Sequence, residues 1–597
     1  MPHGSPEEAQ IAALKSLVEK LRRRIGFIER SRFWKIRERW FALRAHFGVR
    51  GDPVPPLPPV DYAEAMDVQD PYARWLIHHE PRESDLCRLR EVAHTFQSPP
   101  SICVVVDDAS ADASDAIDGV LRQAYPWVRL LRTSECSHGS DAAVRFNAAL
   151  EACTEHFVAF CDPDEVLAPD ASFEVAVTSY ERPEADVIYG DRDTASANGR
   201  RSKPLFLPDW SPETFLCQMY TGRLVFYRRE LVVAAGGFRS GFGTAAHYDL
   251  ALRATERSKA IEHRGRIFYH EKAEQAGAID KQDAAKAIRS ALERRGEEGR
   301  LEHPFPEVDS TIVRYAITKP AQVEIILPTR DLPDFLGRCL TSIFDRSTYR
   351  DFRVNVIDNG SIEPATEHLL RDWHDREPRR FRVVKLDQPF NFSRLVNFGA
   401  RSCDGPYLLL LNNDTEIITN DWIEAMVEQA QRPAIGVVGA RLLYEDGSLQ
   451  HAGVVVGLGE LAGHVYRRAS RDDQGPGGEI LTVRNYSAVT AACMMVRRDV
   501  FEAVDGFDER LPIEFNDTDF CLRILGLGYR NVYVPHAALL HHESKTRGSG
   551  ERSSASSAHK SSGRALFRER WQTSSYRDPY YNGNLTTVTD DGAIALP

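Results

Sequence analysis

The sequence of 597 residues contains no apolar run of about 20 residues, the length that a membrane-spanning helix needs. Its longest apolar stretches, such as residues 407–411, have the length of a single strand. The first residues also lack the apolar core and the small-residue cleavage site of a secretory signal peptide. We therefore expect a cytoplasmic protein whose contact with the inner membrane, if it makes one, is peripheral.

The composition excludes several other classes of protein. The ten cysteines are scattered singly with no C-x-x-C pair, which argues against a zinc module and favours reduced thiols. Glycine (39) and proline (33) are too sparse for a collagenous or disordered chain. The net charge of −12 gives no support to nucleic-acid binding. What remains is an ordinary globular chain of about three to four units.

Basic residues are concentrated near the N-terminus. Residues 15–50 carry twelve lysines and arginines against three acids, and apolar residues recur every three or four positions between residues 11 and 28. This pattern predicts a basic amphipathic helix within residues 1–50. Residues 11–47 would suit an anionic membrane surface, but packing on the body or a short coiled coil would explain them equally well. A Pro-rich linker is expected over residues 51–97.

Two α/β stretches, residues 98–278 and 319–545, repeat the same landmarks at nearly the same spacing. We expect a helical connector between them at residues 279–318 and a Ser-rich loop and tail at residues 546–597. A gene duplication explains the spacings best. The matched landmarks are Asn147 with Asn397, Asp164 with Asp414, Gly237 with Gly506, Arg253 with Arg523, and His270 with His541.

Polar residues follow three predicted strands in the second copy, at Thr329, Asp358 and the run Asn412–Asp414. In an open parallel sheet the carboxyl ends of the strands face one crevice, where ligands bind. A single turn of this kind is more often a cap or a solvated turn. Several aligned strand ends favour a binding site, in which Asp414 can supply an oxygen ligand to a divalent cation.

Two further candidates lie downstream. Asp517 and Asp519 stand near the start of a predicted helix, where a carboxylate could deprotonate a hydroxyl group or simply cap the helix. His541 and His542 end a predicted strand. A single histidine at such a place is more often structural, but the alignment of the two copies, which matches His270 with His541, singles out His541.

The motifs at residues 328–331, 358–361, 390–397, 411–416, 516–523 and 541–544 resemble those of the family 2 glycosyltransferases. The whole chain is similar to two-domain bacterial enzymes that build O-antigen, capsule or other surface polysaccharide. The resemblance implies a UDP- or dTDP-linked sugar donor, a glycan or lipid-linked glycan acceptor, inversion at the anomeric carbon, and Mn²⁺ or Mg²⁺ as cofactor.

The resemblance also assigns roles to individual residues. It makes Asp517 the catalytic base and places the metal between Asp414 and His541. Asn412 stands at the first position of the family's D-x-D motif, which leaves one certain carboxylate there. The positions implied to bind the nucleotide sugar are Pro328, Thr329, Arg330, Asp358, Asn359, Arg394, Asn397, Asn412 and Asn413.

The expected fold is α/β, with two tandem GT-A-like (Rossmann-like) domains of which the first is truncated. The first copy has 41 residues between Val106 and Asn147, whereas the second has 70 between Leu327 and Asn397, so about one strand and one helix are missing. His247 also replaces the acid at the position of Asp517. We therefore expect catalysis in the second copy. Activity in both copies, or a non-catalytic glycan-binding scaffold, are the alternatives.

Overall fold

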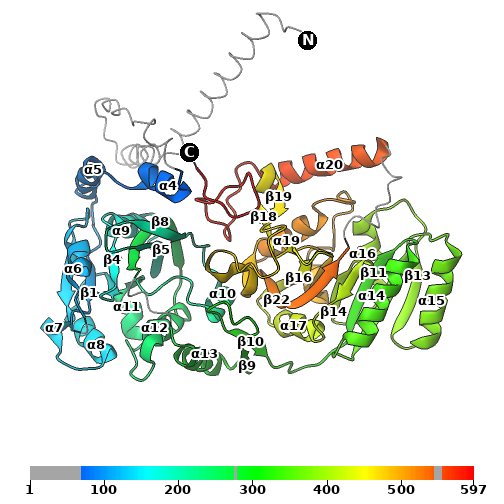
Figure 1. Ribbon diagram of the computed structural model, residues 1–597, viewed down its shortest axis with the longest axis horizontal. Coiled ribbons are helices and arrows are strands. Elements are labelled where there is room, and N and C mark those ends of the chain that lie inside the picture. The colour runs from blue at the N-terminus through cyan, green and yellow to red at the C-terminus, as the bar shows by residue number, and fades with distance from the viewer. Residues whose placement is uncertain (1–68, 110, 274–278, 543–553, 597) are drawn as a thin grey trace, which may run out of the picture.

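The computed structural model describes residues 69–109, 111–273, 279–542 and 554–596 (Figure 1). The predicted N-terminal helix and its proposed membrane contact at residues 11–47 lie outside the described residues. Within the described ranges, every helix is too short or too polar to cross a bilayer.

Two lobes lie side by side, the first coloured blue to green and the second green to orange in Figure 1. The first lobe contains a sheet in the order β2-β1-β3-β7-β5-β8-β4, with β6 paired to β5. Its strands are β1 (Ile102–Val106), β2 (Val128–Arg132), β3 (Phe157–Cys161), β4 (Glu165–Leu167), β5 (Val187–Ala195), β6 (Arg201–Leu205), β7 (Phe226–Arg228) and β8 (Ile261–Lys272). Its helices are α6 (Ser114–Leu121), α7 (Thr133–Cys136), α8 (Ala142–Ala152), α9 (Ala171–Glu181), α10 (Pro212–Cys217), α11 (Arg229–Ala234) and α12 (Ala246–Thr255).

The second lobe repeats this order with one more strand, as β13-β12-β11-β14-β21-β16-β22-β15. Its strands are β11 (Val323–Thr329), β12 (Phe352–Asp358), β13 (Phe381–Lys385), β14 (Tyr407–Leu411), β15 (Thr415–Ile417), β16 (Ile435–Leu443), β21 (Cys493–Arg497) and β22 (Arg530–His541). Short strands β17 (Leu449–His451) and β20 (Arg484–Tyr486) extend the sheet, and β18 (Val454–Val456) pairs with β19 (Ala462–His464). Its helices are α14 (Pro333–Arg346), α15 (Pro364–Arg376), α16 (Phe392–Arg401), α17 (Trp422–Ala430), α18 (Arg498–Ala503) and α19 (Asn516–Gly526).

The predicted truncation of the first copy is confirmed. In the second copy, β11, β12, β13 and β14 are parallel neighbours, whereas the first copy has only β2, β1 and β3 in this part of its sheet. The unit that has no counterpart in the first copy is α15 with β13. The shorter interval before Asn147 leaves no chain to form it.

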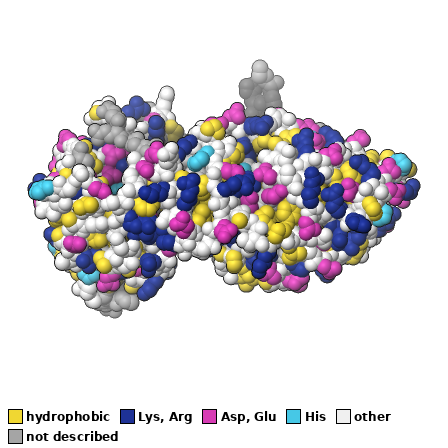
Figure 2. Space-filling view, turned by 90° about the horizontal axis from the view of Figure 1, so that it is seen from below, with side chains coloured by type: hydrophobic (Ala, Val, Ile, Leu, Met, Phe, Trp, Pro, Cys, Tyr) yellow, Lys and Arg dark blue, Asp and Glu magenta, His cyan; other side chains and the backbone are white. Residues whose placement is uncertain are grey.

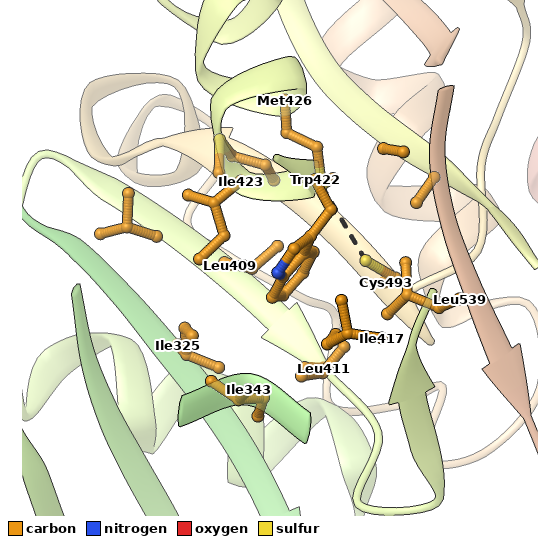
Figure 3. Close-up of a cluster of buried hydrophobic side chains, with 14 of the residues drawn as sticks. Ile325, Ile343, Leu409, Leu411, Ile417, Trp422, Ile423, Met426, Cys493 and Leu539 are labelled. Carbon is orange, nitrogen blue, oxygen red and sulfur yellow. Dashed lines mark hydrogen bonds between the residues drawn. The ribbon is translucent and has the colours of Figure 1, made fainter. Parts of the chain in front are cut away.

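The core of the second lobe fixes the strands whose ends form the crevice. Trp422 on α17 is fully buried against Leu409 and Leu411 of β14 (Figure 3). Its indole Nε1 donates to Ser347 Oγ at 2.9 Å, so that burial leaves no polar atom of the indole unpaired. Close packing on both sides of β14 holds residues 412–414 at a defined position.

Three of the predicted connecting segments contain helices or strands that the sequence analysis did not predict. The expected linker 51–97 contains the helices α4 (Pro71–His79) and α5 (Glu83–Ala93), because Trp75 and Leu89 have apolar surface to bury against the first lobe. The connector contains α13 (Lys281–Arg295) but continues as a hairpin of β9 (Gly299–Glu302) and β10 (Ile312–Tyr315). The expected Ser-rich loop includes the helix α20 (Ser554–Trp571), anchored by the buried Phe567.

The lobes are joined by a buried polar cluster. Glu213 on α10 of the first lobe pairs with Arg530 at 2.8 Å and Arg432 at 3.3 Å in the second lobe, and it accepts from Asn485 Nδ2 at 2.8 Å. Burial would raise the pKa of Glu213, but the two arginines outweigh burial and lower it. From below, the lobes meet at a narrow waist and carry interspersed basic and acidic side chains (Figure 2).

A second junction is made by residues 577–590, which we call the tail strap; they lie between the lobes in Figure 1. On the first lobe, Asn582 Nδ2 donates to Asp191 Oδ1 at 2.9 Å. On the second lobe, Val456 N donates to Asp578 Oδ2 at 2.8 Å, and Gly459 N donates to Thr587 O at 2.8 Å. The strap therefore bonds to both copies.

Candidate functional site

Three strand ends meet at one edge of the second sheet, as predicted. Thr329 at the end of β11 lies opposite Asp358 at the end of β12, and β14 runs on the other side of β11. Asn413 Nδ2 donates to Thr329 Oγ1 at 2.8 Å, and Asn359 N donates to Thr329 O at 2.9 Å. Thr329 thus connects the polar ends of its two neighbouring strands.

Asp414 and His541 come together although 127 positions of sequence separate them. The short strand β15 pairs with β22, with Thr415 opposite His541. This register places His541 Nε2 3.2 Å from Asp414 Oδ1 and 3.2 Å from Asn412 Nδ2. A carboxylate, an imidazole and an amide therefore converge on one point beyond β14.

Gln450 on β17 sets the orientation of the His541 ring. Its Oε1 lies 2.6 Å from His541 Nδ1, and its Nε2 donates to the His541 carbonyl at 3.3 Å. In the neutral ring, the Nδ1 hydrogen is then donated to Gln450, and the lone pair of Nε2 faces Asp414 Oδ1. Two electron-pair donors at this separation form a set that suits a divalent cation.

The carboxylate of Asp517 lies beside the same edge. Asp517 is half-buried at the start of α19, and its Oδ2 accepts from Ala491 N at 3.2 Å. The next residue, Ala492, accepts through its carbonyl oxygen from Asn412 N at 3.0 Å. Residues 491–492 therefore connect the candidate base directly to the turn that carries Asp414.

Asp519 has a different environment from Asp517. It is fully buried and pairs with Arg523 at 2.8 Å and with Arg570 at 2.6 Å, and it accepts from Trp571 Nε1 at 3.0 Å. Asp519 therefore ties α20 to α19. Of the two predicted acids, Asp517 is the one at the edge of the sheet.

Other predicted nucleotide contacts make structural bonds. Asn397 is buried and makes two hydrogen bonds with the backbone of Phe507, both at 2.8 Å. Its Nδ2 donates to the Phe507 carbonyl, and its Oδ1 accepts from Phe507 N. Arg394 pairs with Glu509 at 2.9 Å, and Asn359 Nδ2 donates to the carbonyl of Leu386 at 2.9 Å. Their proposed nucleotide contacts stay predictions.

The remaining predicted residues lie at the crevice mouth. Pro328 is half-buried within β11, and Arg330, the first residue after that strand, is exposed. Asp358 is buried and caps its own turn by accepting from Ser361 N at 2.9 Å. Gln450 is the residue whose role the sequence did not reveal. The pairing of β17 with β16 brings it behind His541.

The alignment of His270 with His541 is wrong by one residue. In the first copy, β4 pairs with β8 so that Glu165 lies opposite Glu271, which makes Glu271 the counterpart of His541. His270 points to the other face of the strand, where its Nδ1 lies 2.7 Å from Asp193. A shift of one residue in a strand moves a side chain to the opposite face, so His270 is no metal ligand in this crevice.

Comparison with known proteins agrees with the duplicated sheet. The family model for glycosyl transferase family 2 matches residues 89–243 and 324–504, more than half of the chain. An O-antigen biosynthesis protein RfbC of Myxococcus xanthus is 36% identical over 514 residues, which are 83% of this chain and 39% of that protein. An uncharacterised protein y4gI of Sinorhizobium fredii is 34% identical over 557 residues, 85% of this chain and 60% of that protein.

A shorter relative aligns with one part of the chain. The N-acetylglucosaminyl-diphospho-decaprenol L-rhamnosyltransferase of Mycobacterium tuberculosis is 30% identical over 252 residues, which are 38% of this chain and 78% of that enzyme. The chain thus spans less than two thirds of the length of the two relatives that match most of it.

Proposed function

Because the chain belongs to glycosyl transferase family 2, we propose that its second copy transfers a sugar from a nucleotide-sugar donor to a growing bacterial surface polysaccharide. The donor is UDP- or dTDP-linked, and the acceptor is a glycan or a lipid-linked glycan. The similarity to an O-antigen biosynthesis protein and to a rhamnosyltransferase supports this substrate class. Transfer proceeds in one displacement with inversion.

The observation that carries the proposal is the convergence of Asp414, His541 and Asp517 on one edge of the second sheet. Asp414 and His541 are 3.2 Å apart, and Asp517 is bonded to the loop that contacts the same turn. Transfer from a nucleoside diphosphate requires a base for the acceptor hydroxyl and stabilisation of the departing diphosphate.

Asp517 is the proposed base. Its Oδ2 already accepts from a backbone N–H, and its half-exposed position lets an acceptor hydroxyl approach. A carboxylate within hydrogen-bonding distance can take the hydroxyl proton as the oxygen attacks. Asp519 cannot substitute for it, since arginines and an indole surround that carboxylate.

Asp414 and His541 are the proposed holders of Mn²⁺ or Mg²⁺. Such an ion supplies positive charge that stabilises the departing diphosphate. Gln450 fixes the imidazole so that Nε2 faces Asp414, and Asn412 offers a third polar group. Thr329 and Asp358 are proposed to hold the nucleoside at the neighbouring strand ends, where ligands bind in sheets of this kind.

Release of UDP or dTDP from a panel of nucleotide sugars, with and without Mn²⁺, tests the proposal. We expect release from at least one donor, its increase by an acceptor glycan, and its loss in EDTA. Absence of release from every donor, with the acceptor present, would favour a non-catalytic glycan-binding scaffold. Full release in EDTA would remove the metal from the proposal and leave the transfer itself in place.

A further inference from the structure

The strand registers align the two copies residue by residue. β3 occupies the same place beside β1 that β14 occupies beside β11, and β7 and β21 pair antiparallel with these strands in the same register. These pairings make Asp164 the counterpart of Asp414 and Arg223 the counterpart of Ala492. One position of the duplicated sheet thus carries an arginine in one copy and an alanine in the other.

The guanidinium of Arg223 lies among the acids at the strand end of the first copy. Its two terminal nitrogens pair with Asp162 Oδ2 at 2.8 Å and Asp164 Oδ2 at 2.6 Å, and its Nε lies 3.4 Å from Glu165 Oε1. Its side chain is 19% exposed, and that of Glu165 is fully buried. The guanidinium of Arg223 therefore bridges the turn of the first copy that corresponds to the Asp414 turn of the second copy.

The guanidinium keeps its charge in this position. Burial by itself would lower the pKa of Arg223, but Glu165, Asp162 and Asp164 outweigh burial and raise it. The counterpart of His541 is Glu271, which pairs with a second arginine, Arg192, at 3.2 Å. The acids of this crevice are therefore neutralised by side chains of the chain itself.

We propose that Arg223 occupies the place of the divalent cation in the first copy, and that arginine or alanine at this one position decides which copy binds a metal. A planar guanidinium forks between two carboxylates much as a cation bridges them, but it cannot be exchanged with solution. The first copy thus keeps the geometry of the strand end without the metal. The inference for the second copy depends on the proposed function, while that for the first copy does not.

The second copy carries no long side chain at the equivalent position. Ala492 extends no further than its Cβ, and its carbonyl oxygen accepts from Asn412 N at 3.0 Å. An arginine there would start from the same point of the sheet as Arg223 and reach the turn of residues 412–414. Exchange of these two residues therefore tests both halves of the inference.

The experiment counts Mn²⁺ ions bound to the full chain by titration calorimetry with MnCl₂ alone. We expect one ion in the wild type, two in Arg223→Ala, none in Ala492→Arg, and one in the double variant. Adding Asp164→Asn to Arg223→Ala should abolish the gained site. Arg228→Ala is the matched control, since Arg228 pairs with Asp186 outside the crevice at 3.2 Å, and its count should equal that of the wild type.

Two bound ions in the wild type would overturn the inference. An unchanged number of ions in Arg223→Ala would also overturn it, provided that this variant has the melting temperature and the near-ultraviolet circular dichroism of the wild type. If Arg223→Ala does not fold, Ala492→Arg decides: retention of the ion overturns the inference and its loss supports it. A wild type that binds no ion would contradict the proposed metal dependence of transfer. A rise from zero to one ion in Arg223→Ala would then still support the role of Arg223.

Discussion

The two acids in the first turn of α19, Asp517 and Asp519, have different environments and therefore different expected roles. Asp517 faces the edge of the sheet, whereas Asp519 is buried among Arg523, Arg570 and Trp571. They are two positions apart, which on a helix places side chains on different faces. Identical substitutions at the two positions should therefore have different effects.

We predict that Asp517→Asn lowers turnover by roughly 10²–10⁴-fold because the amide cannot accept the proton. Mn²⁺ binding, UDP binding and the melting temperature should stay near wild type. Asp519→Asn, the matched control, should instead cost about 3–5 kcal/mol of unfolding free energy, since it removes the buried anion that pairs with two partly buried arginines. Steady-state kinetics and urea unfolding measure the two effects. Wild-type turnover in Asp517→Asn would remove the residue as base.

Gln450 reaches the metal site through His541, to which it bonds at 2.6 Å. We predict that Gln450→Leu weakens Mn²⁺ binding about 10–100-fold, the usual effect of losing a group that orients a ligand. His541→Ala should weaken it at least as much. Calorimetric Mn²⁺ affinity is the readout, together with the KM for the donor and kcat. Equal Mn²⁺ affinity in Gln450→Leu and wild type would show that the ring needs no such support.

At the scale of elements, the landmarks that reveal the duplication prove to be a folding motif. Asn147 bonds both backbone groups of Phe238, as Asn397 does with Phe507. The preceding glycine has a φ of +64° in both copies, and a Cβ there would lie 2.4 or 2.5 Å from the asparagine oxygen. Both copies therefore need this pair for the chain to turn toward its next helix.

We predict that Asn397→Ala and Asn147→Ala destabilise the protein alike, by about 1–3 kcal/mol for each buried backbone group left unpaired. Thermal unfolding measures this loss. UDP affinity then distinguishes a structural role from a direct role in nucleotide binding. If Asn397 contacts the nucleotide directly, Asn397→Ala should lose more UDP affinity than its smaller fraction of folded protein explains, whereas Asn147→Ala should not. An intact melting temperature in either variant would contradict the structural role.

The strand ends were predictable because buried strands are short apolar runs and their polar ends are visible in the sequence. The duplication and the missing strand and helix followed from spacing. The pairing of Asp414 with His541 came from the family resemblance, because the spacing matches His541 with the wrong residue, His270. The helices α4 and α5 were missed because the prolines before them suggested a continuous linker. The roles of Gln450 and Arg223 could not be predicted, since each residue meets its partners through the pairing of strands. The sequence does not reveal the register of that pairing to within one residue.

At the scale of the whole molecule, the junction made by the tail strap includes two side chains, Asp578 in the strap and His263 behind Asp191, whose pKa values are raised in the folded protein. Burial raises the pKa of Asp578 to about 6. Burial would lower the pKa of His263, but Asp191 and Asp209 outweigh it and raise the pKa. His263 Nε2 lies 2.9 Å from Asp191, the residue that also accepts from Asn582.

We predict that the strap is bound more tightly at pH 5.5 than at pH 8. Both folded pKa values lie above the unfolded values, so both groups stabilise at low pH, and that stability is lost as the pH rises through the folded pKa. For Asp578 the loss from below pH 4 to well above pH 6 is about 3 kcal/mol, of which roughly 1 kcal/mol falls between pH 5.5 and pH 8. The melting temperature should therefore fall from pH 5.5 to pH 8 less steeply in Asp578→Asn and His263→Gln than in wild type. An equal slope in all three would contradict the prediction.

The tail strap also imposes an order in time on the synthesis of the chain. Asn582 is 391 positions after its partner Asp191. At about 5–20 residues per second, a ribosome needs roughly 20–80 s to add the residues between them. The first sheet can pair its strands long before then, but the Asp191 carboxylate and the Leu207 carbonyl lack their bonds to Asn582 while the second copy is made. Each newly made molecule therefore passes through a stage lasting tens of seconds in which these groups are open to water or to a chaperone.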